Sequence, residues 1–228
     1  MSIFKFILLS LTFLLLSACG GGSGDIASNT TTTNPVVIPP PQSIQAAKAW
    51  DNLLKVGGSW TLEGSDSLGN KYQQTLVVTL GPEKSYSEYN VPKGPFNTAL
   101  ISSTTLKNSI NVGTKTQELY FTKDTNEVKF GRVSSPLYCF QSVVSYPVID
   151  IAILNSGGSL FSATKFSSCI NLGSDGSTSA SWSYQAENEV PFFCVKIDSE
   201  NTCVDVNSSG QLGKKMKIVT PSLTLKNY

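Results

Sequence analysis

The sequence predicts an all-β domain, an antiparallel meander that forms a sandwich or a barrel, with one short N-terminal helix and two disulfides. Runs of strand-like composition follow one another from Trp60 onward, separated by turn clusters rich in Asp, Asn and Gly. Strong helix formers are sparse after residue 55, whereas Ser and Thr are abundant. Four cysteines, an even number, lie in the same part of the chain. These patterns leave the choice between a sandwich and a barrel open.

The helix is expected at the start of the domain. Ser43 is placed to cap its first turn, and Gly57 with Gly58 would end it. Apolar residues recur there at the three- and four-residue spacing of one helix face: Ile44, Ala47, Trp50 and Leu54. We expect this apolar face to pack on the sheet.

Strands are expected, in chain order, at residues 59–65, 71–80, 84–91, 98–107, 116–121, 127–133, 137–144, 179–185, 192–197, 203–206 and 214–225. The first two flank a turn at residues 66–70 and form a hairpin. Residues 147–154 are ambiguous, because Pro147 permits a short helix whereas the Ile and Val content favours a buried strand. We expect the strand.

The N-terminus has the pattern of an export signal. Lys5 is followed by an apolar run at residues 6–16, which is too short to span a bilayer. The sequence Leu16-Ser17-Ala18-Cys19 resembles the lipobox of bacterial lipoproteins. That resemblance implies removal of residues 1–18, diacylation of the Cys19 thiol and acylation of the freed amine, which together anchor the chain stably. An ordinary secretory signal with an accidental cysteine is the alternative.

The expected organisation is a signal peptide at residues 1–18, a lipidated Cys19 with a linker at 19–42, and one β-rich domain at 43–228. The linker is rich in Gly, Thr and Pro and cannot bury enough apolar surface to fold. Its packing onto the domain as a clasp is the alternative. Gly20 after the lipidated position implies the outer membrane of Gram-negative bacteria, with periplasmic or surface exposure left open.

Composition removes several classes of function. The chain contains no His, which excludes Ser-His-Asp triads, Cys-His dyads and His-ligated zinc. The formal net charge is +1, so the basic surplus of a nucleic-acid binder is missing. We therefore expect no nucleic-acid partner, no cofactor, no metal and no enzymatic activity.

The cysteines indicate an oxidising compartment. With Cys19 acylated, four remain and allow three pairings: Cys139, Cys169, Cys194 and Cys203. A hairpin turning at residues 198–201 would place Cys194 opposite Cys203 at a bridgeable distance, which leaves Cys139 with Cys169. A redox or metal role is disfavoured, because no Cys-x-x-Cys is present.

Catalytic motifs are weak. Ser162 and Lys165 match the Ser-x-x-Lys of penicillin-binding enzymes, but no Lys-Thr-Gly accompanies them and we interpret the match as chance. Carboxylate-only glycan hydrolysis needs two acidic groups, for which these residues are candidates: Asp150, Glu187 with Glu189, and Asp198 with Glu200. We expect the paired residues to lie in solvated turns, and Asp150 to make a structural hydrogen bond among Ile and Val neighbours.

Ion and headgroup sites are also weighed. Three Asp/Asn pairs offer oxygen ligands for calcium: Asp66 with Asn70, Asp124 with Asn126, and Asp205 with Asn207. We expect turn formation to explain all three. Lys214, Lys215 and Lys217 could contact anionic headgroups, but we expect a solvated sheet face, with Met216 and Ile218 pointing to the core.

Two family resemblances bear on the domain. Residues 64–72, 182–184, 194 and 203–210 resemble uncharacterised, Ser/Thr-rich secreted or lipid-anchored proteins of Gram-negative bacteria, which implies a fold but no mechanism. A helix leading into Gly58-Ser59-Trp60 is similar to the entry of lipocalins, and this implies a barrel that holds a small apolar ligand. No second lipocalin signature is present.

Three functions follow, in order of preference. The first is an outer-membrane-anchored lipoprotein whose non-enzymatic β domain interacts with an envelope protein or glycan, or has a structural role there. The second is a lipocalin-like carrier of a small apolar ligand. The third is a carboxylate-based glycan hydrolase.

Overall fold

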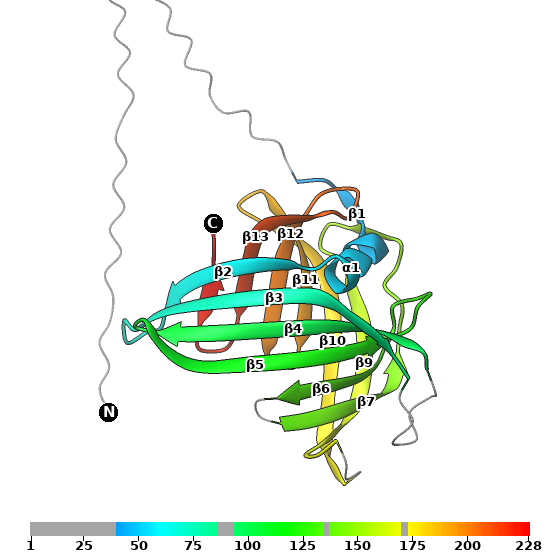
Figure 1. Cartoon of the computed structure of the whole chain (residues 1–228). Coiled ribbons are helices and arrows are strands. Elements are labelled where there is room, and N and C mark those ends of the chain that lie inside the picture. The colour runs from blue at the N-terminus through cyan, green and yellow to red at the C-terminus, as the bar shows by residue number, and fades with distance from the viewer. Residues whose placement is uncertain (1–39, 86–93, 135–136, 170–172) are drawn as a thin grey trace, which may run out of the picture. The chain divides into compact units, whose positions relative to one another are not determined.

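A computed structural model describes residues 40–85, 94–134, 137–169 and 173–228. In these ranges twelve antiparallel strands form a closed barrel, while two short strands form a separate ribbon (Figure 1). The all-β prediction is confirmed, and the structure decides for a barrel over a sandwich. Within the same ranges, no helix has the length and apolar character needed to cross a lipid bilayer.

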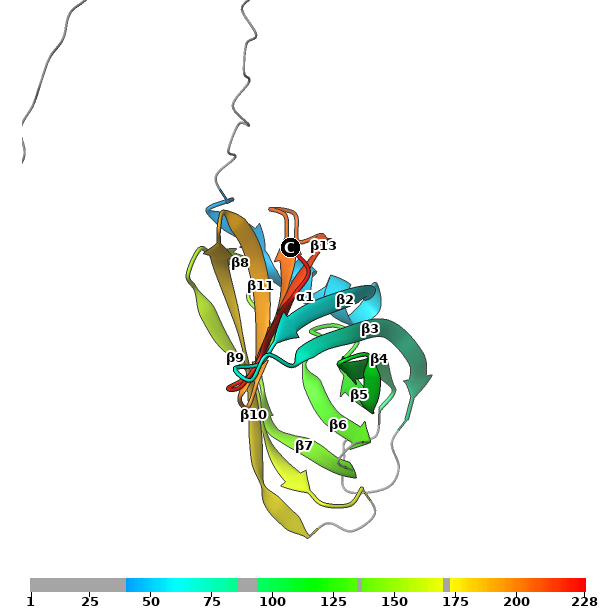
Figure 2. The same ribbon diagram turned by 90° about the vertical axis from the view of Figure 1, so that its left-hand side faces the viewer.

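The barrel strands are β2 (Gly58–Ser65), β3 (Lys71–Lys84), β4 (Phe96–Lys107), β5 (Ile110–Phe121), β6 (Val128–Ser134), β7 (Leu137–Ser145), β9 (Gly157–Phe166), β10 (Ser174–Glu187), β11 (Val190–Ile197), β12 (Glu200–Val206), β13 (Leu212–Val219) and β14 (Thr224–Lys226). They follow chain order around the ring, which closes where β14 pairs with β2. The remaining strands, β1 (Ser43–Gln45) and β8 (Ile151–Ile153), pair with each other. Figure 2 shows β9, β10 and β11 along one wall and β3, β4 and β5 along the facing wall.

Several boundaries differ from the expectation. The expected strand at 214–225 is two strands, because Thr220 and Leu223 form a hydrogen-bonded turn between β13 and β14. Strand β9 was not predicted. Its sequence is rich in Gly and Ser and lacks the Val and Ile residues that mark a strand. Most of the strand expected at 84–91 lies outside the described residues. At 147–154 only β8 is a strand, and it is half-buried: Ala152 packs in the core, whereas Ile151 and Ile153 are exposed because β8 pairs only with β1.

The helix α1 (Ala46–Lys55) closes the end of the barrel at which β2 begins (Figure 1). Ile44, Trp50 and Leu54 are buried as predicted, whereas Ala46 and Ala49 are more buried than Ala47. Ser43 does not cap the helix, because it lies in β1 and pairs with Ile153, and Gln45 occupies the capping position without a side-chain bond. The first helical N–H groups instead donate to the backbone oxygens of residues 149 and 150.

Side-chain hydrogen bonds fasten α1 to loops from distant parts of the chain. The Trp50 indole N–H donates to the Asn126 carbonyl oxygen at 3.0 Å, in the loop between β5 and β6. The Asn52 side-chain amide donates to the Gly210 carbonyl oxygen at 2.8 Å, in the loop between β12 and β13. Both bonds are buried, so each satisfies a polar group that would otherwise be desolvated without a partner. The helix is therefore a fixed plug.

Inward-facing positions change character along the barrel. Register partners across β3, β4 and β5 form successive rows: Val78, Ile101 and Gln117; then Leu76, Ser103 and Lys115; then Gln74, Thr105 and Gly113. Cross-strand partners share one face of a sheet. The interior is thus apolar beneath α1 and becomes polar toward the opposite end.

Both predicted disulfides are present. Cys194 and Cys203 lie directly opposite each other in the β11–β12 register, with their Cα atoms 4.0 Å apart. The hairpin turns at Asp198, which has a positive φ of 51°. Cys139 on β7 is bonded to Cys169, just beyond β9, with a Cα separation of 5.2 Å.

We predict that Trp50→Ala lowers the free energy of unfolding by about 3–5 kcal/mol, because it removes a large buried side chain and leaves the Asn126 carbonyl unpaired. Urea denaturation under non-reducing conditions measures the change. Val56→Ala, at an exposed position at the end of the same helix, is the control and should change stability by less than about 0.5 kcal/mol. Equal losses in the two variants would contradict the role of α1 as a plug.

Candidate functional site

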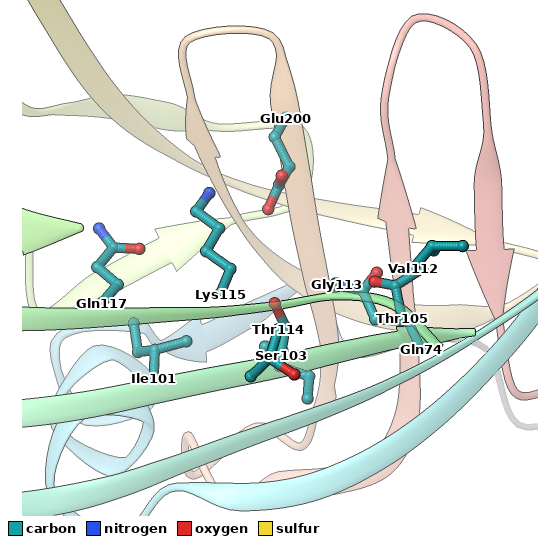
Figure 3. Close-up of a pocket in the computed structure, with 11 residues that line it drawn as sticks. Gln74, Ile101, Ser103, Thr105, Val112, Gly113, Thr114, Lys115, Gln117 and Glu200 are labelled. Atoms are coloured by element: carbon teal, nitrogen blue, oxygen red, sulfur yellow. The ribbon is translucent and has the colours of Figure 1, made fainter. Parts of the chain in front are cut away.

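A cavity of about 370 Å³ lies inside the barrel, toward the end opposite α1. Its walls come from β3, β4 and β5 on one side and from the start of β12 on the other (Figure 3). The lining residues are Gln74, Leu76, Ile101, Ser103, Thr105, Val112, Gly113, Thr114, Lys115, Gln117 and Glu200. Val112, Gly113 and Thr114 are exposed, so the cavity opens to solvent near the β4–β5 turn.

The cavity leads to a smaller apolar hollow of about 100 Å³ beneath α1. The two spaces share Leu76, Ile101, Gln117 and Glu200 in their walls. Deeper in, the hollow is lined by Trp50, Leu53 and Leu54 of the helix and by aromatic and aliphatic residues of the strands. A ligand could therefore place a polar end in the outer cavity and an apolar end below it.

Two opposite charges face the outer cavity. Figure 3 shows the Lys115 side chain rising from β5 and the Glu200 side chain reaching into the same space from the facing wall. Neither group forms a hydrogen bond or an ion pair with any described residue. Lys115 is half-buried and Glu200 is exposed at the mouth of the cavity, so both charges are accessible to a ligand that enters it.

The ionisable groups near Lys115 and Glu200 already have partners within the protein. The Lys165 ammonium lies 4.4 Å from the centre of the Tyr138 ring, a cation–π contact. The Thr178 hydroxyl donates to the Asp198 carboxylate at 3.0 Å. Burial raises the pKa of Tyr138, and the negative charges of Asp198 and Glu200 raise this pKa further, so Tyr138 stays neutral at pH 7.

A second space of about 520 Å³ lies outside the barrel, at the end closed by α1. It contains two carboxylates, those of Glu189 and Asp205, beneath Pro40 and Pro41. Burial raises the pKa of Asp205, although its carboxylate also accepts the Lys215 backbone N–H at 2.8 Å.

The carboxylates considered for glycan hydrolysis do not converge on one cavity. Asp150 is exposed rather than surrounded by its Ile and Val neighbours, and its backbone oxygen accepts the Ala46 N–H at 2.9 Å. Glu187 is bonded to Lys217 on the outside of the barrel. Glu189 lies in an exposed turn, while Glu200 faces the interior cavity.

The Ser-x-x-Lys match has no catalytic geometry. Both residues lie on β9, where side chains alternate between the two faces of the sheet. Ser162 is exposed and pairs with Ser179, whereas Lys165 pairs with the buried Phe140. The hydroxyl and the ammonium therefore lie on opposite faces of β9, which does not match the geometry of a Ser-Lys pair in which Lys activates Ser.

The Asp/Asn pairs are used by turns and loops. Asp66 accepts hydrogen bonds from Leu68, Asn70 and Tyr72, and these bonds, led by the Asn70 side chain, hold the pKa of Asp66 below its ordinary value. Asn126 donates to Asp51 on α1. The Asn207 side-chain oxygen accepts the backbone N–H groups of residues 209 and 211. In the described ranges, no three potential metal-ligating side chains of His, Cys, Asp or Glu come together.

The basic cluster differs from its prediction in one residue. Lys214 and Lys215 are exposed, and Met216 and Ile218 point inward as expected. Lys217, however, is buried beside Phe192 and donates to the Glu187 carboxylate. Lys217 is therefore not part of a solvated face. The Phe192 ring that it contacts is covered in turn by the ring of Tyr228.

The Gly58-Ser59-Trp60 segment occupies the expected place, where α1 passes into β2. Trp60 is buried in the barrel and its indole N–H donates to the Gly213 carbonyl oxygen at 3.3 Å. A Cβ atom on Gly58 would lie 2.4 Å from the Trp60 ring, so the ring needs glycine there. The barrel has twelve strands, however, whereas lipocalin barrels have eight.

Cys19, the proposed lipidation site, lies outside the described residues. The four cysteines of the domain are all disulfide-bonded, so none of them offers a thiol for redox chemistry or metal binding. The Gln185 side-chain amide covers the second bond and lies 3.0 Å from the Cys194 sulfur.

Several exposed apolar side chains lie between the last residues of β7 and the end of β8. We name them together the 143–153 surface; they are Val143, Val144, Tyr146, Ile149, Ile151 and Ile153. This surface adjoins residues 42–45, at the start of the folded domain. The Leu154 N–H donates to the Gln42 oxygen at 2.8 Å, and β8 pairs with β1.

The interior charges Lys115 and Glu200 were not predicted from the sequence as a pair. One signal was available in β5. Lys115 and Gln117 lie four and two residues before the buried Leu119, so all three side chains are expected on the inward face of the strand. The facing residue Glu200 depends on ring closure, which sequence pattern does not give. Searches of protein-family models, curated proteins and solved structures find no match to this chain.

We predict that Glu187→Gln destabilises the domain at neutral pH, since it leaves the buried Lys217 ammonium without its counter-charge. A hydrogen bond from Lys217 holds the pKa of Glu187 below its ordinary value of 4.5. The ionised pair therefore stabilises the fold above about pH 4.5, and this stabilisation is lost as the pH falls through the folded-state pKa. Unfolding midpoints of wild type and variant should differ at pH 7, and the difference should shrink as the pH falls below 4.5 and through the folded-state pKa of Glu187. Glu189→Gln, in the adjacent exposed turn, is the control that should match wild type across the same pH range.

Proposed function

We propose that this protein is an envelope-anchored barrel that binds a small amphipathic molecule inside its open end. The observation that carries the proposal is the interior space, which runs from a solvent-open polar cavity to an apolar hollow beneath α1. The proposal develops the carrier hypothesis and gives the ligand a polar part as well as an apolar one.

The shape and chemistry of the space support this proposal. A cavity of about 370 Å³ is of the size that small-molecule sites occupy. Polar side chains at its mouth can orient a ligand, and Leu76, Ile101 and Trp50 supply apolar contacts. The plug α1 separates this space from solvent at the other end, so a ligand would enter and leave through the β4–β5 side.

We predict that Gly113→Phe blocks ligand binding without disturbing the barrel. A Cβ atom on Gly113 would meet no atom within 4 Å, and the added ring would fill the mouth of the cavity. Native mass spectrometry of the exported chain should show a small-molecule adduct on wild type that is at least about tenfold less abundant on the variant.

Gly173→Phe is the matched control, because Gly173 also has open space around its Cβ position and does not line the cavity. It should retain the adduct. A wild-type protein free of any adduct after export, or an adduct that survives Gly113→Phe, would count against a ligand in the interior.

We also propose that the chain is lipid-anchored through Cys19 and that the 143–153 surface contacts an envelope component. This keeps the interaction role as a second candidate function. It is supported by the lipobox resemblance and by the exposure of Ile151 and Ile153, at 63% and 66%, beside the entry of the chain. Apolar exposure of this extent in one short segment is typical of a contact surface.

A photo-crosslinking residue at position 151 should capture an envelope component in cells, whereas one at position 68 should not. Leu68 is 85% exposed but lies in the β2–β3 turn at the opposite end of the barrel, so it serves as the control. Cys19→Ala should move the protein from the membrane to the soluble fraction and remove the crosslink. Unchanged membrane association of Cys19→Ala would refute the anchor.

A further inference from the structure

We propose that the ligand carries both an anionic and a cationic group at its polar end, with an apolar chain behind them. This inference rests on the proposed ligand-binding function and specifies the chemical class of the ligand. Lys115 would contact the anionic group and Glu200 the cationic group, while the chain extends past Leu76 and Ile101 toward α1. A zwitterionic amphiphile fits this arrangement.

The first step of the argument is the state of the two charges. Lys115 and Glu200 line the same cavity from facing walls (Figure 3), yet no ion pair joins them at 4.0 Å or less, and no other described residue pairs with either. Opposite charges held apart across a cavity leave room for a molecule between them. A ligand with a single charge would satisfy one group and meet the other as a repulsive neighbour.

The second step is that nearby charges do not change this balance. Lys165 is engaged with the Tyr138 ring, and the Asp198 carboxylate accepts the Thr178 hydroxyl and the Ser179 N–H. Among the cavity-lining residues, Lys115 and Glu200 are the charged side chains. The cavity therefore presents one positive and one negative group, which sum to zero.

The third step concerns the uncharged lining. Ser103, Thr105 and Gln117 surround the two charges and can donate or accept hydrogen bonds to oxygen atoms of a headgroup. Below them, the row of Val78 and Ile101 begins the apolar hollow, which ends at Trp50. The transition from polar to apolar occurs within one row of residues, which favours a ligand whose headgroup joins its chain directly.

The test uses three probes with the same eight-carbon chain: octylphosphocholine, octyl sulfate and octyltrimethylammonium, each below its critical micelle concentration. Calorimetric titration into the full chain carrying Cys19→Ala should show octylphosphocholine binding about tenfold more tightly than either singly charged probe. Lys115→Gln should weaken octylphosphocholine and octyl sulfate, and Glu200→Gln should weaken octylphosphocholine and octyltrimethylammonium. Lys196→Gln, an exposed lysine on β11 outside the cavity, is the control and should change none of them.

The outcomes separate this inference from the function on which it rests. Equal affinity for the three probes, or preference for a singly charged one, overturns the zwitterion if Gly113→Phe still abolishes binding, and the ligand-binding function then stands. Binding that is insensitive to Gly113→Phe, or the absence of binding by every probe, overturns both. Selective loss in the two charge variants with retention in Lys196→Gln supports the inference.

Discussion

The width of the barrel is the constraint on which the rest of the structure depends. Eight strands enclose a lumen that side chains can just fill, and the diameter grows with strand number. Twelve strands therefore enclose more space than inward side chains occupy. At one end α1 fills the excess, with Ala46, Ala49 and Trp50 buried among strand residues. At the other end nothing in the described chain fills it, and the cavity is the result. The plug and the cavity are thus two consequences of one geometric requirement.

Local pattern predicted most of the elements because alternation and turn chemistry are local. The β2–β3 hairpin follows from the Asp66 turn, and the cysteine pairing on β11 and β12 follows from a two-strand register. Closure of the ring was not predictable from the sequence. It depends on the pairing of β14 with β2, which lie at opposite ends of the domain sequence and share one register pair, Lys226 and Glu63. Strand β9 was not predicted either. Its buried Ala163 and exposed Ser162 differ little in hydrophobicity, so the alternation of apolar and polar residues is weak.

The candidate site was harder to predict than the fold, for a physical reason. Motif searches assume that neighbours in sequence act together, yet a strand sends alternate side chains to opposite faces, which separated Ser162 from Lys165. Carboxylates such as Glu187 were identified as residues but not as members of a pair, because their partners come from other strands. Lys115 and Glu200 share a cavity only after β5 and β12 face each other across the closed ring. The proposed binding site therefore forms only when the ring of strands is closed.

The hydrogen bonds of α1 also have a consequence for the order of folding. Trp50 bonds a residue 76 positions later in the chain, and Asn52 bonds one 158 positions later. A helix of ten residues is too short to be stable alone in water, so it gains its stability from these late partners. We therefore expect α1 to become stable only after the loop between β12 and β13 has formed. Domains rich in such non-local contacts generally fold more slowly than helical bundles, so we expect slow folding of this barrel.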